Sequence, residues 1–345
     1  MDHRLQALSH AEVAAMPMKE TNPPSAVRIG LSGWNYPPWR KVFYPEDLTH
    51  KRELWFASRA VDTIEINGSF YSLVRPESVK RWYSDAPEGF AFSVKGSRYI
   101  THMLRLRDAE TALANFFASG ILALEEKLGP ILWQLPPNFS FDADRLARFF
   151  DLLPRTMKAA SRRARKHDGR VEGRAYVEPK GDRVIRHTIE VRHPSFCDAR
   201  FVDLLREHDI AFCVADTAKH FLEYEDVTSD FVYVRLHGDL KLYESGYTRA
   251  ALKKWAARIE AWSQGNEVAG ARRISSAPAR RTNVRGGRDV YVYFDNDAKV
   301  RAPFDARTLR ALLDGERVPR APKGIRSAGE PARTVWPAWK SLASR

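Results

Sequence analysis

Three short segments of this 345-residue sequence place polar or ionisable side chains at every second position among apolar ones. The segments read TIEIN at 63–67, TIEVRH at 188–193 and FVYVRLHG at 231–238. Successive side chains of a β-strand point to opposite faces, so each segment predicts a strand with one apolar and one polar face. Carboxylate, guanidinium and imidazole groups on such faces suit acid/base chemistry and anion binding. The polar faces carry Glu65 and Asn67, Glu190 and Arg192, and Arg235 and His237.

The two glutamates and the histidine are the candidates for proton transfer. A carboxylate in a partly desolvated site can be tuned to exchange a proton, and histidine titrates near neutral pH. We therefore predict Glu65, Glu190 and His237 as catalytic residues, with His237 near solvent as a proton donor. The alternative is a structural ion-pair network that only holds strand ends together.

Three cations lie in the same kind of position and suit an anionic ligand. Lys95, Arg192 and Arg235 end or follow strand-like segments, and arginine binds phosphate or carboxylate through two donors. We expect Arg235 to contact the anion, and we expect the carboxylate of Glu65 or Glu190 to hold the Arg235 side chain in position. The other predicted substrate-binding residues are Asn67, Asp216, Asn296, Trp34 and Tyr71.

A metal site is the alternative use of the same region. Histidines and carboxylates that could ligate zinc or manganese are present, but no HxH or HExxH spacing occurs and nearby cations oppose a metal. We therefore predict no cofactor and no metal ligands, with a divalent metal as the alternative. The possible ligands are His102, His193, His237, Glu65, Glu190 and Asp216.

The elements that must position these residues form a repeating pattern. Eight strand-like segments alternate with helical patterns, which indicates a parallel sheet, and eight units favour a closed (β/α)₈ barrel over an open sheet. Polar residues near the carboxyl ends of barrel strands line the usual active-site mouth. The predicted strands are 28–33, 62–66, 90–94, 130–134, 187–191, 211–215, 231–236 and 290–294.

The net charge of +13 comes mainly from segments that lie outside the alternating strands and helices. Residues 155–186 and 265–288 are basic and lie where a helix would lead into the next strand, so they are predicted as insertions in two αβ connections. The residues 1–27 and 318–345 are predicted tails. We therefore predict a single barrel domain over 28–317. Its basic insertions could contact nucleic acid non-specifically.

Several classes of protein are disfavoured. No apolar segment approaches the roughly 20 residues of a membrane-spanning helix, and residues 1–27 lack the apolar core of a secretory signal. Cys197 and Cys213 form no CxxC pattern, which disfavours a disulfide framework. We expect a cytoplasmic protein that has no membrane partner, and the oligomeric state stays open.

Seven longer motifs occur along the chain. They are GLSGWNYPPWRKVFYP (30–45), IEINGSFYSL (64–73), WYSDAPEGFAFSVKGSRYITH (82–102), QLPPNF (134–139), IEVRHPSF (189–196), YVRLHG (233–238) and YFDND (293–297). In this order they resemble the YecE-like proteins, a prokaryotic family of TIM-like barrels labelled as domain of unknown function 72. The resemblance implies the barrel but no settled activity, and a link to nucleic-acid metabolism rests on fold analogy alone. The family usually has Asn where this chain has Asp295, so Asn296 is the better match.

These observations lead to one functional hypothesis and two alternatives. The hypothesis is an enzyme that uses acid/base residues on a phosphorylated or other anionic substrate, such as a nucleotide or a nucleic-acid end. The alternatives are a metal-dependent phosphoester hydrolase and a non-catalytic protein that binds nucleic acid or a small ligand.

Overall fold

The computed structural model of the chain describes residues 26–278 and 287–317. Eight parallel strands follow one another in sequence order and close into a barrel, which confirms the predicted fold class. The strands are β1 (Val27–Ser32), β2 (Thr63–Ile66), β3 (Ala91–Lys95), β4 (Leu128–Gln134), β5 (His187–Glu190), β6 (Ala211–Asp216), β7 (Phe231–Leu236) and β8 (Asp289–Phe294).

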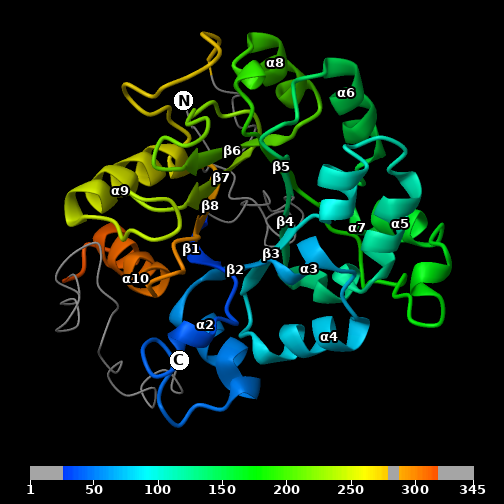
Figure 1. The fold of residues 1–345 in the computed structure, drawn as a ribbon, viewed down its shortest axis with the longest axis horizontal. Coiled ribbons are helices and arrows are strands. Elements are labelled where there is room, and N and C mark those ends of the chain that lie inside the picture. The colour runs from blue at the N-terminus through cyan, green and yellow to red at the C-terminus, as the bar shows by residue number, and fades with distance from the viewer. Residues whose placement is uncertain (1–25, 279–286, 318–345) are drawn as a thin grey trace, which may run out of the picture.

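Helices surround the barrel on its outside, as Figure 1 shows. The connection between β6 and β7 contains no helix, and all its residues lie within the described part of the chain. The α-helices are α2 (Glu53–Ala60), α3 (Gly68–Tyr71), α4 (Pro76–Asp85), α5 (Glu110–Ala118), α6 (Ala143–Leu152), α7 (Met157–Ala164), α8 (Ala199–Glu207), α9 (Arg249–Ser263) and α10 (Ala302–Leu313). Short 3₁₀ turns are η1 (Pro37–Trp39), η2 (His50–Arg52), η4 (Ile121–Lys127), η5 (Gly169–Val171) and η6 (Pro194–Phe196), and η3 (Tyr99–Met103) is a π-helix.

Side-chain caps fix where several of these helices begin. The Asp142 carboxylate accepts a hydrogen bond from the backbone N–H of Arg145 at the start of α6. Asp198 caps α8 and Thr248 caps α9 in the same manner. Such caps satisfy backbone donors that have no partner inside the helix.

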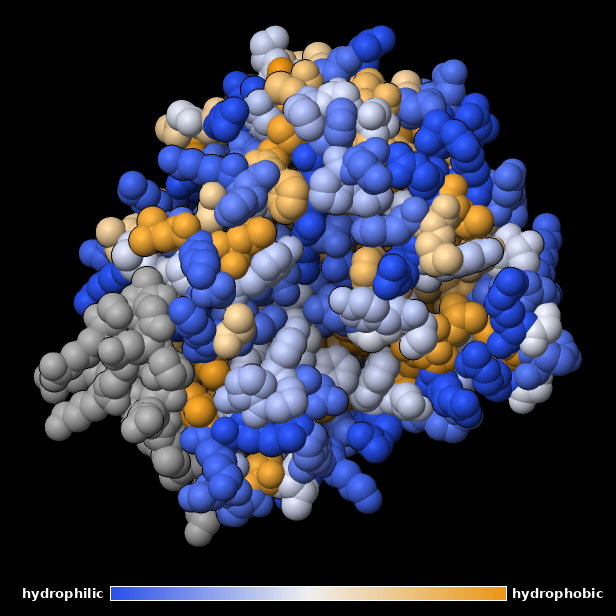
Figure 2. Space-filling view, in the orientation of Figure 1, coloured by the Kyte–Doolittle hydropathy of each residue, from blue (hydrophilic) through white to orange (hydrophobic). Residues whose placement is uncertain are grey.

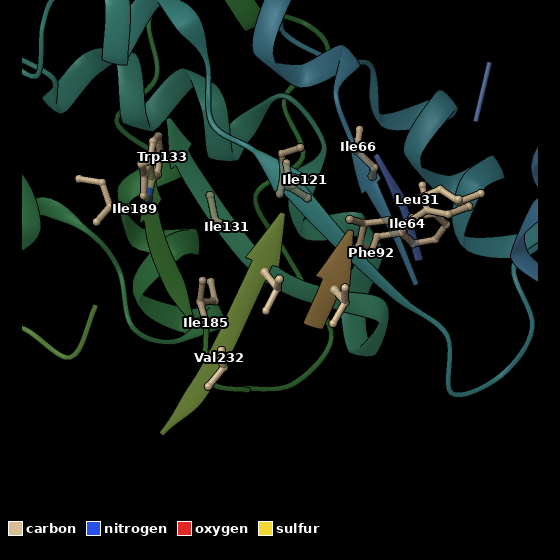
Figure 3. Packing of buried hydrophobic residues seen from close by; sticks show 14 of the residues in the cluster. Leu31, Ile64, Ile66, Phe92, Ile121, Ile131, Trp133, Ile185, Ile189 and Val232 are labelled. Atoms are coloured by element: carbon tan, nitrogen blue, oxygen red, sulfur yellow. The ribbon is translucent and has the colours of Figure 1, made fainter. Parts of the chain in front are cut away.

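The outward faces of the strands form the main core with the helices. Alternate residues such as Leu31, Ile64, Phe92, Ile131 and Trp133 are fully buried there. Figure 3 shows these side chains in the packing between the strands and the helices around them. This layer fixes the register of the strands, because a shift of one residue would turn the apolar face inward.

The opposite faces of the strands fill the barrel interior. A second and smaller cluster of buried residues lies there, and it is rich in tyrosine. These side chains close the lower part of the barrel, as is usual for the fold. The cluster consists of Ala91, Leu132, Ala211, Cys213, Phe231, Tyr233, Tyr291 and Tyr293.

The basic segment 155–186 is part of the folded body rather than an open loop. It contains α7, which packs against α5 and buries Met157, Ala160 and Ala164. As an αβ connection the segment starts at the end of the barrel opposite the mouth, and from there it extends to loops at the mouth. Arg174 donates to Val74 O at 2.9 Å after β2, and Arg170 lies 5.9 Å from the ring of Tyr99 after β3.

The second basic segment is described only over 265–278 and 287–288, and this part is also anchored. The backbone N–H groups of Ile274 and Ser275 donate to the carboxylate of Asp226 at 2.7 and 3.0 Å. The predicted tails lie almost entirely outside the described residues. Among the helices that the structure describes, none has the length and apolar character needed to cross a membrane.

Candidate active site at the barrel mouth

A layer of hydroxyl groups forms the floor of the site. Thr63 Oγ1 lies 2.9 Å from the Tyr293 hydroxyl, and Ser93 Oγ lies 2.7 Å from the Tyr233 hydroxyl. Tyr233 donates to Glu65 Oε2 at 2.6 Å. Burial raises the pKa of Tyr233 well above its ordinary value, so this hydroxyl stays a donor.

Arg235 lies at the centre of the layer above this floor and is only 1% exposed. Its Nη1 donates to Glu190 Oε2 at 2.8 Å. Its Nη2 lies within hydrogen-bond distance of Glu65 Oε1 (2.9 Å), Asp295 Oδ2 (3.0 Å) and Ser32 Oγ (3.1 Å). Three carboxylates therefore surround the guanidinium, and Glu65 and Glu190 both hold Arg235 as expected. The contact between Arg235 and an anion stays a prediction.

Glu190 joins Arg235 to a second arginine on the rim. Its Oε1 accepts from Arg192 Nε and from Gln134 Nε2, both at 2.9 Å. Burial by itself would raise the pKa of Glu190, but the charges of Arg192 and Arg235 outweigh it and hold that pKa well below its ordinary value. Glu190 is therefore an ionised carboxylate at neutral pH.

Lys95 ends β3 and points its ammonium group into the same region. The ammonium nitrogen lies 4.4 Å from the centre of the Phe70 ring. Within the described part of the chain it makes no hydrogen bond or ion pair. Burial and the charge of Arg235 lower the pKa of Lys95. An unpaired and partly desolvated cation is the kind of group that an anionic ligand would stabilise.

His237 follows β7 and is fully buried, which contradicts its expected position near solvent. The loop after β7 covers it: Tyr243 N donates to His237 O at 2.5 Å, and the two rings lie 5.2 Å apart edge to face. His237 Nδ1 lies 3.0 Å from Asp295 Oδ2, at an angle that makes no regular hydrogen bond. Its Nε2 lies 3.4 Å from Arg235 Nη1.

The pKa values of two carboxyl groups after β8, Asp295 and Asp297, are shifted in opposite directions. Burial would raise the pKa of Asp295, but Arg235 and His237 lower it below its ordinary range. Burial and the charge of Asp295 raise the pKa of Asp297 well above its ordinary value. Asp297 Oδ1 is buried without a hydrogen-bond partner. Asp297 was not predicted, although it shares the YFDND motif with Asp295.

Asn67, Trp34 and Tyr71 occupy three different environments at the mouth. Asn67 Nδ2 lies 3.1 Å from Ser32 Oγ, while its Oδ1 is buried without a partner. Trp34 is partly buried and packs edge-on against Trp82. Tyr71 is 70% exposed at the end of α3. All three therefore lie on segments that follow β1 and β2, as the sequence indicated.

Two predicted substrate-binding residues lie outside the lumen. Asp216 pairs in register with Leu236, whose side chain faces the outer core, so Asp216 also points outward. It lines a groove of about 440 Å³ beside α9, where burial raises its pKa to about 6. Asn296 is buried beyond the end of β8 and donates to Ser245 O (3.0 Å) and Asp305 Oδ2 (2.8 Å), so it holds a loop to α10.

The potential metal ligands are not gathered into a metal site. Among the described residues, no group of three or more His, Cys, Asp and Glu side chains is arranged to hold a metal ion. Glu65 and Glu190 are engaged by arginine, and His193 Nδ1 lies 2.8 Å from Ser195 Oγ. The described residues therefore lend no support to a metal-dependent hydrolase.

The mouth itself is hydrophilic. The strands succeed one another anticlockwise in Figure 1, and right-handed connections then place their carboxyl ends toward the viewer. Figure 2, in the same orientation, shows hydrophilic residues around the centre of this face and a hollow between them. The charged layer described above lies beneath this face.

Comparisons with known proteins agree with this architecture. The family described as "Protein of unknown function DUF72" matches residues 28–326. The UPF0759 protein YecE of Escherichia coli (strain K12) is 29% identical over 129 residues, which cover 37% of this chain and 44% of that protein. The UPF0759 protein YunF of Bacillus subtilis (strain 168) is 25% identical over 126 residues, covering 35% and 44%. The matches thus span less than half of these two relatives.

Two solved structures share the fold. A DUF72 family protein from Thermotoga maritima MSB8 superimposes with a TM-score of 0.62 at 22% identity, covering 84% of this chain and 99% of that one. A DUF72 family protein from Enterococcus faecalis V583 gives a TM-score of 0.59 at 15% identity, covering 84% and 95%. At these identities the likeness concerns the barrel and not its chemistry.

Proposed function

The chain belongs to the DUF72 family, and from this premise and the geometry of its barrel mouth we propose that it is an enzyme acting by acid/base chemistry on a phosphorylated or otherwise anionic small molecule. The observation that carries the proposal is the Lys95 ammonium, which lies in the mouth without a hydrogen bond or ion pair among the described residues. The neighbouring cations are ion-paired, Arg192 with Glu190 and Arg235 with Glu190, Glu65 and Asp295. Lys95 is therefore a cation of the described mouth that is left for a ligand.

Asp295 and Asp297 are the acid/base pair in this proposal. Their environments push their pKa values in opposite directions, since Arg235 and His237 lower the pKa of Asp295 while burial and the charge of Asp295 raise that of Asp297. Neighbouring carboxyl groups with such a difference can divide the roles of base and acid. Asp297 would donate a proton to the substrate, and Asp295 would accept one.

In this scheme the predicted catalytic residues do not contact the substrate. They position the side chains that do. Glu65 and Glu190 keep Arg235 in place, and Arg235 and His237 keep Asp295 ionised. All four side chains are buried beneath the mouth. We therefore assign them to positioning and keep proton transfer for the two aspartates.

A ligand screen tests the anion site. We expect phosphate or a sugar phosphate to raise the melting temperature of the wild-type protein by about 2–4 °C for each kcal/mol of binding free energy at saturation. Lys95→Met should lose this shift. Lys253→Met, on the exposed face of α9, is the matched control and should keep it.

Turnover then separates an enzyme from a binding protein. For a ligand found in the screen, Asp297→Asn should retain binding but lose at least about 100-fold in rate, the usual contribution of a general acid. Binding without turnover in the wild-type protein would favour the non-catalytic alternative. The absence of any shift with a broad panel of anions would contradict the proposal as a whole.

A further inference from the structure

Exposed apolar side chains gather at one side of the mouth. Five large hydrophobic residues are exposed in the described part of the chain, and three of them follow β2 or β3. These are Tyr71 (70% exposed), Met103 (64%) and Tyr99 (39%). Large apolar groups exposed together on a surface commonly mark a binding site.

These residues continue inward to the unpaired lysine. Phe70 contacts Tyr71 edge to face at 5.0 Å between ring centres, and His102 at 5.1 Å. Lys95 lies over the Phe70 ring at 4.4 Å. We call Phe70, Tyr71, Tyr99, His102 and Met103 the aromatic rim. The rim connects a solvent-exposed ring directly to the cation in the mouth.

The local structure holds the rim in place. Ser69 Oγ donates to the backbone oxygen of Lys95 at 2.7 Å, which fastens α3 to the end of β3. The π-helix η3 carries Tyr99, His102 and Met103, and π-helical turns occur frequently at functional sites. Rigid support of this kind suits a binding surface.

The charge around the rim favours an anion. Burial and the nearby charges of Lys95, Arg98, Arg192 and Arg105 lower the pKa of His102 to about 4, so the imidazole is neutral at pH 7. Arg170, which belongs to the basic segment 155–186, lies 5.9 Å from the Tyr99 ring and is itself paired with Asp168 at 2.6 Å, whereas Lys95 beside the rim is unpaired among the described residues. A planar group that carries an anion would complement both the rings and the cations.

We infer that the ligand of this site is a nucleoside monophosphate, with its phosphate at Lys95 and its base stacked on Tyr71. The inference rests on the proposed function and names the substrate class for the same site. A simple sugar phosphate would satisfy Lys95 but would leave the rim unused. Tyr71 is exposed, so its ring is accessible without any rearrangement.

Calorimetric titration with three probes tests the inference: adenosine 5′-monophosphate, ribose 5-phosphate and inorganic phosphate. We expect the wild-type protein to bind the nucleotide about tenfold more tightly than ribose 5-phosphate, the usual contribution of one stacked base. Tyr71→Ser should remove this preference and leave the affinity for ribose 5-phosphate unchanged. Tyr71→Phe keeps the ring and should keep the preference.

The outcomes distinguish this inference from the proposed function. Equal affinities for the nucleotide and ribose 5-phosphate would overturn the stacking site while leaving the anion site standing. A nucleotide preference that survives Tyr71→Ser would also overturn it. If none of the three probes binds, the inference is overturned, and the broad anion screen described above decides separately whether the proposed function fails as well. Because Tyr71 is exposed, an unchanged melting temperature of both variants serves as the folding control.

Discussion

The two ends of the barrel interior differ in how their charged and polar side chains are paired. At the end where the strands begin, Arg186 donates to Asp289 at 2.6 Å and to Asp230 at 3.3 Å. Arg28 lies over the ring of Tyr291 beside them. At the mouth, three carboxylates share Arg235, while Lys95 Nζ, Asn67 Oδ1 and Asp297 Oδ1 have no hydrogen-bond partner among the described residues.

Under the proposed function, this difference separates a network that only stabilises the fold from one that also binds a ligand. An unsatisfied buried polar group costs about 1–3 kcal/mol, so a fold selected only for stability would pair it or replace it. At the first end the charges of Arg186, Asp230 and Asp289 are paired within the protein. At the mouth Asn67 Oδ1 and Asp297 Oδ1 are buried without a hydrogen-bond partner, an arrangement that fits the ligand site proposed above.

The largest expected effect comes from removing the shared arginine. Arg235→Met would leave Glu65, Glu190 and Asp295 buried without their common partner, and we expect the free energy of unfolding to fall by about 3–5 kcal/mol. Arg186→Met, at the half-exposed opposite end, should cost about 1 kcal/mol. Urea denaturation measures both. Equal losses would remove the distinction between the two ends.

The dependence of stability on pH should show two opposite contributions. Glu190 has a folded-state pKa well below its ordinary value, so the unfolded state binds this proton first, and stability is lost as pH falls below about 4.5. Asp305, which accepts from Asn296, has its pKa raised to about 7 by burial. The folded state keeps this proton longer, so stability falls as pH rises from about 4 to 7.

Single variants separate these contributions in urea titrations at several pH values. Asp305→Asn should flatten the loss between pH 4 and 7, where one proton changes the free energy of unfolding by up to about 1.4 kcal/mol per pH unit. Glu190→Gln should flatten only the loss below pH 4.5. If either variant leaves its own interval unchanged, the corresponding group is not responsible.

The smallest expected effect is a shift in the titration of one imidazole. Lys95→Met removes a cation near His102 and should raise the pKa of His102 from about 4 toward its ordinary 6.5. The rise should be partial, because burial is the larger cause of the lowered value. NMR titration of the histidine resonances measures this pKa, with Lys253→Met as the unaffected control. A pKa that does not move in Lys95→Met would place the lysine charge away from the aromatic rim.

Local pattern in the sequence determined the fold and most of the polar lumen. Eight alternating strand signals predicted the closed barrel, and the alternation in β2, β5 and β7 placed Glu65, Glu190 and Arg235 inside it. This worked because the period of two in a strand decides which face a residue occupies, without reference to the rest of the chain. The same rule failed for Asp216, because the sequence of β6 has no clear polar face from which to read the direction.

Only the tertiary structure decided which charges are paired and which are left over. Arg235 meets Glu65 across 170 residues of sequence, and Asp295 reaches the same guanidinium from β8. The loop after β7 buries His237, and Asn296 turns to Asp305 on α10. Such contacts depend on how the closed barrel brings distant strand ends and loops together, and the periodicity of a single strand carries no information about them.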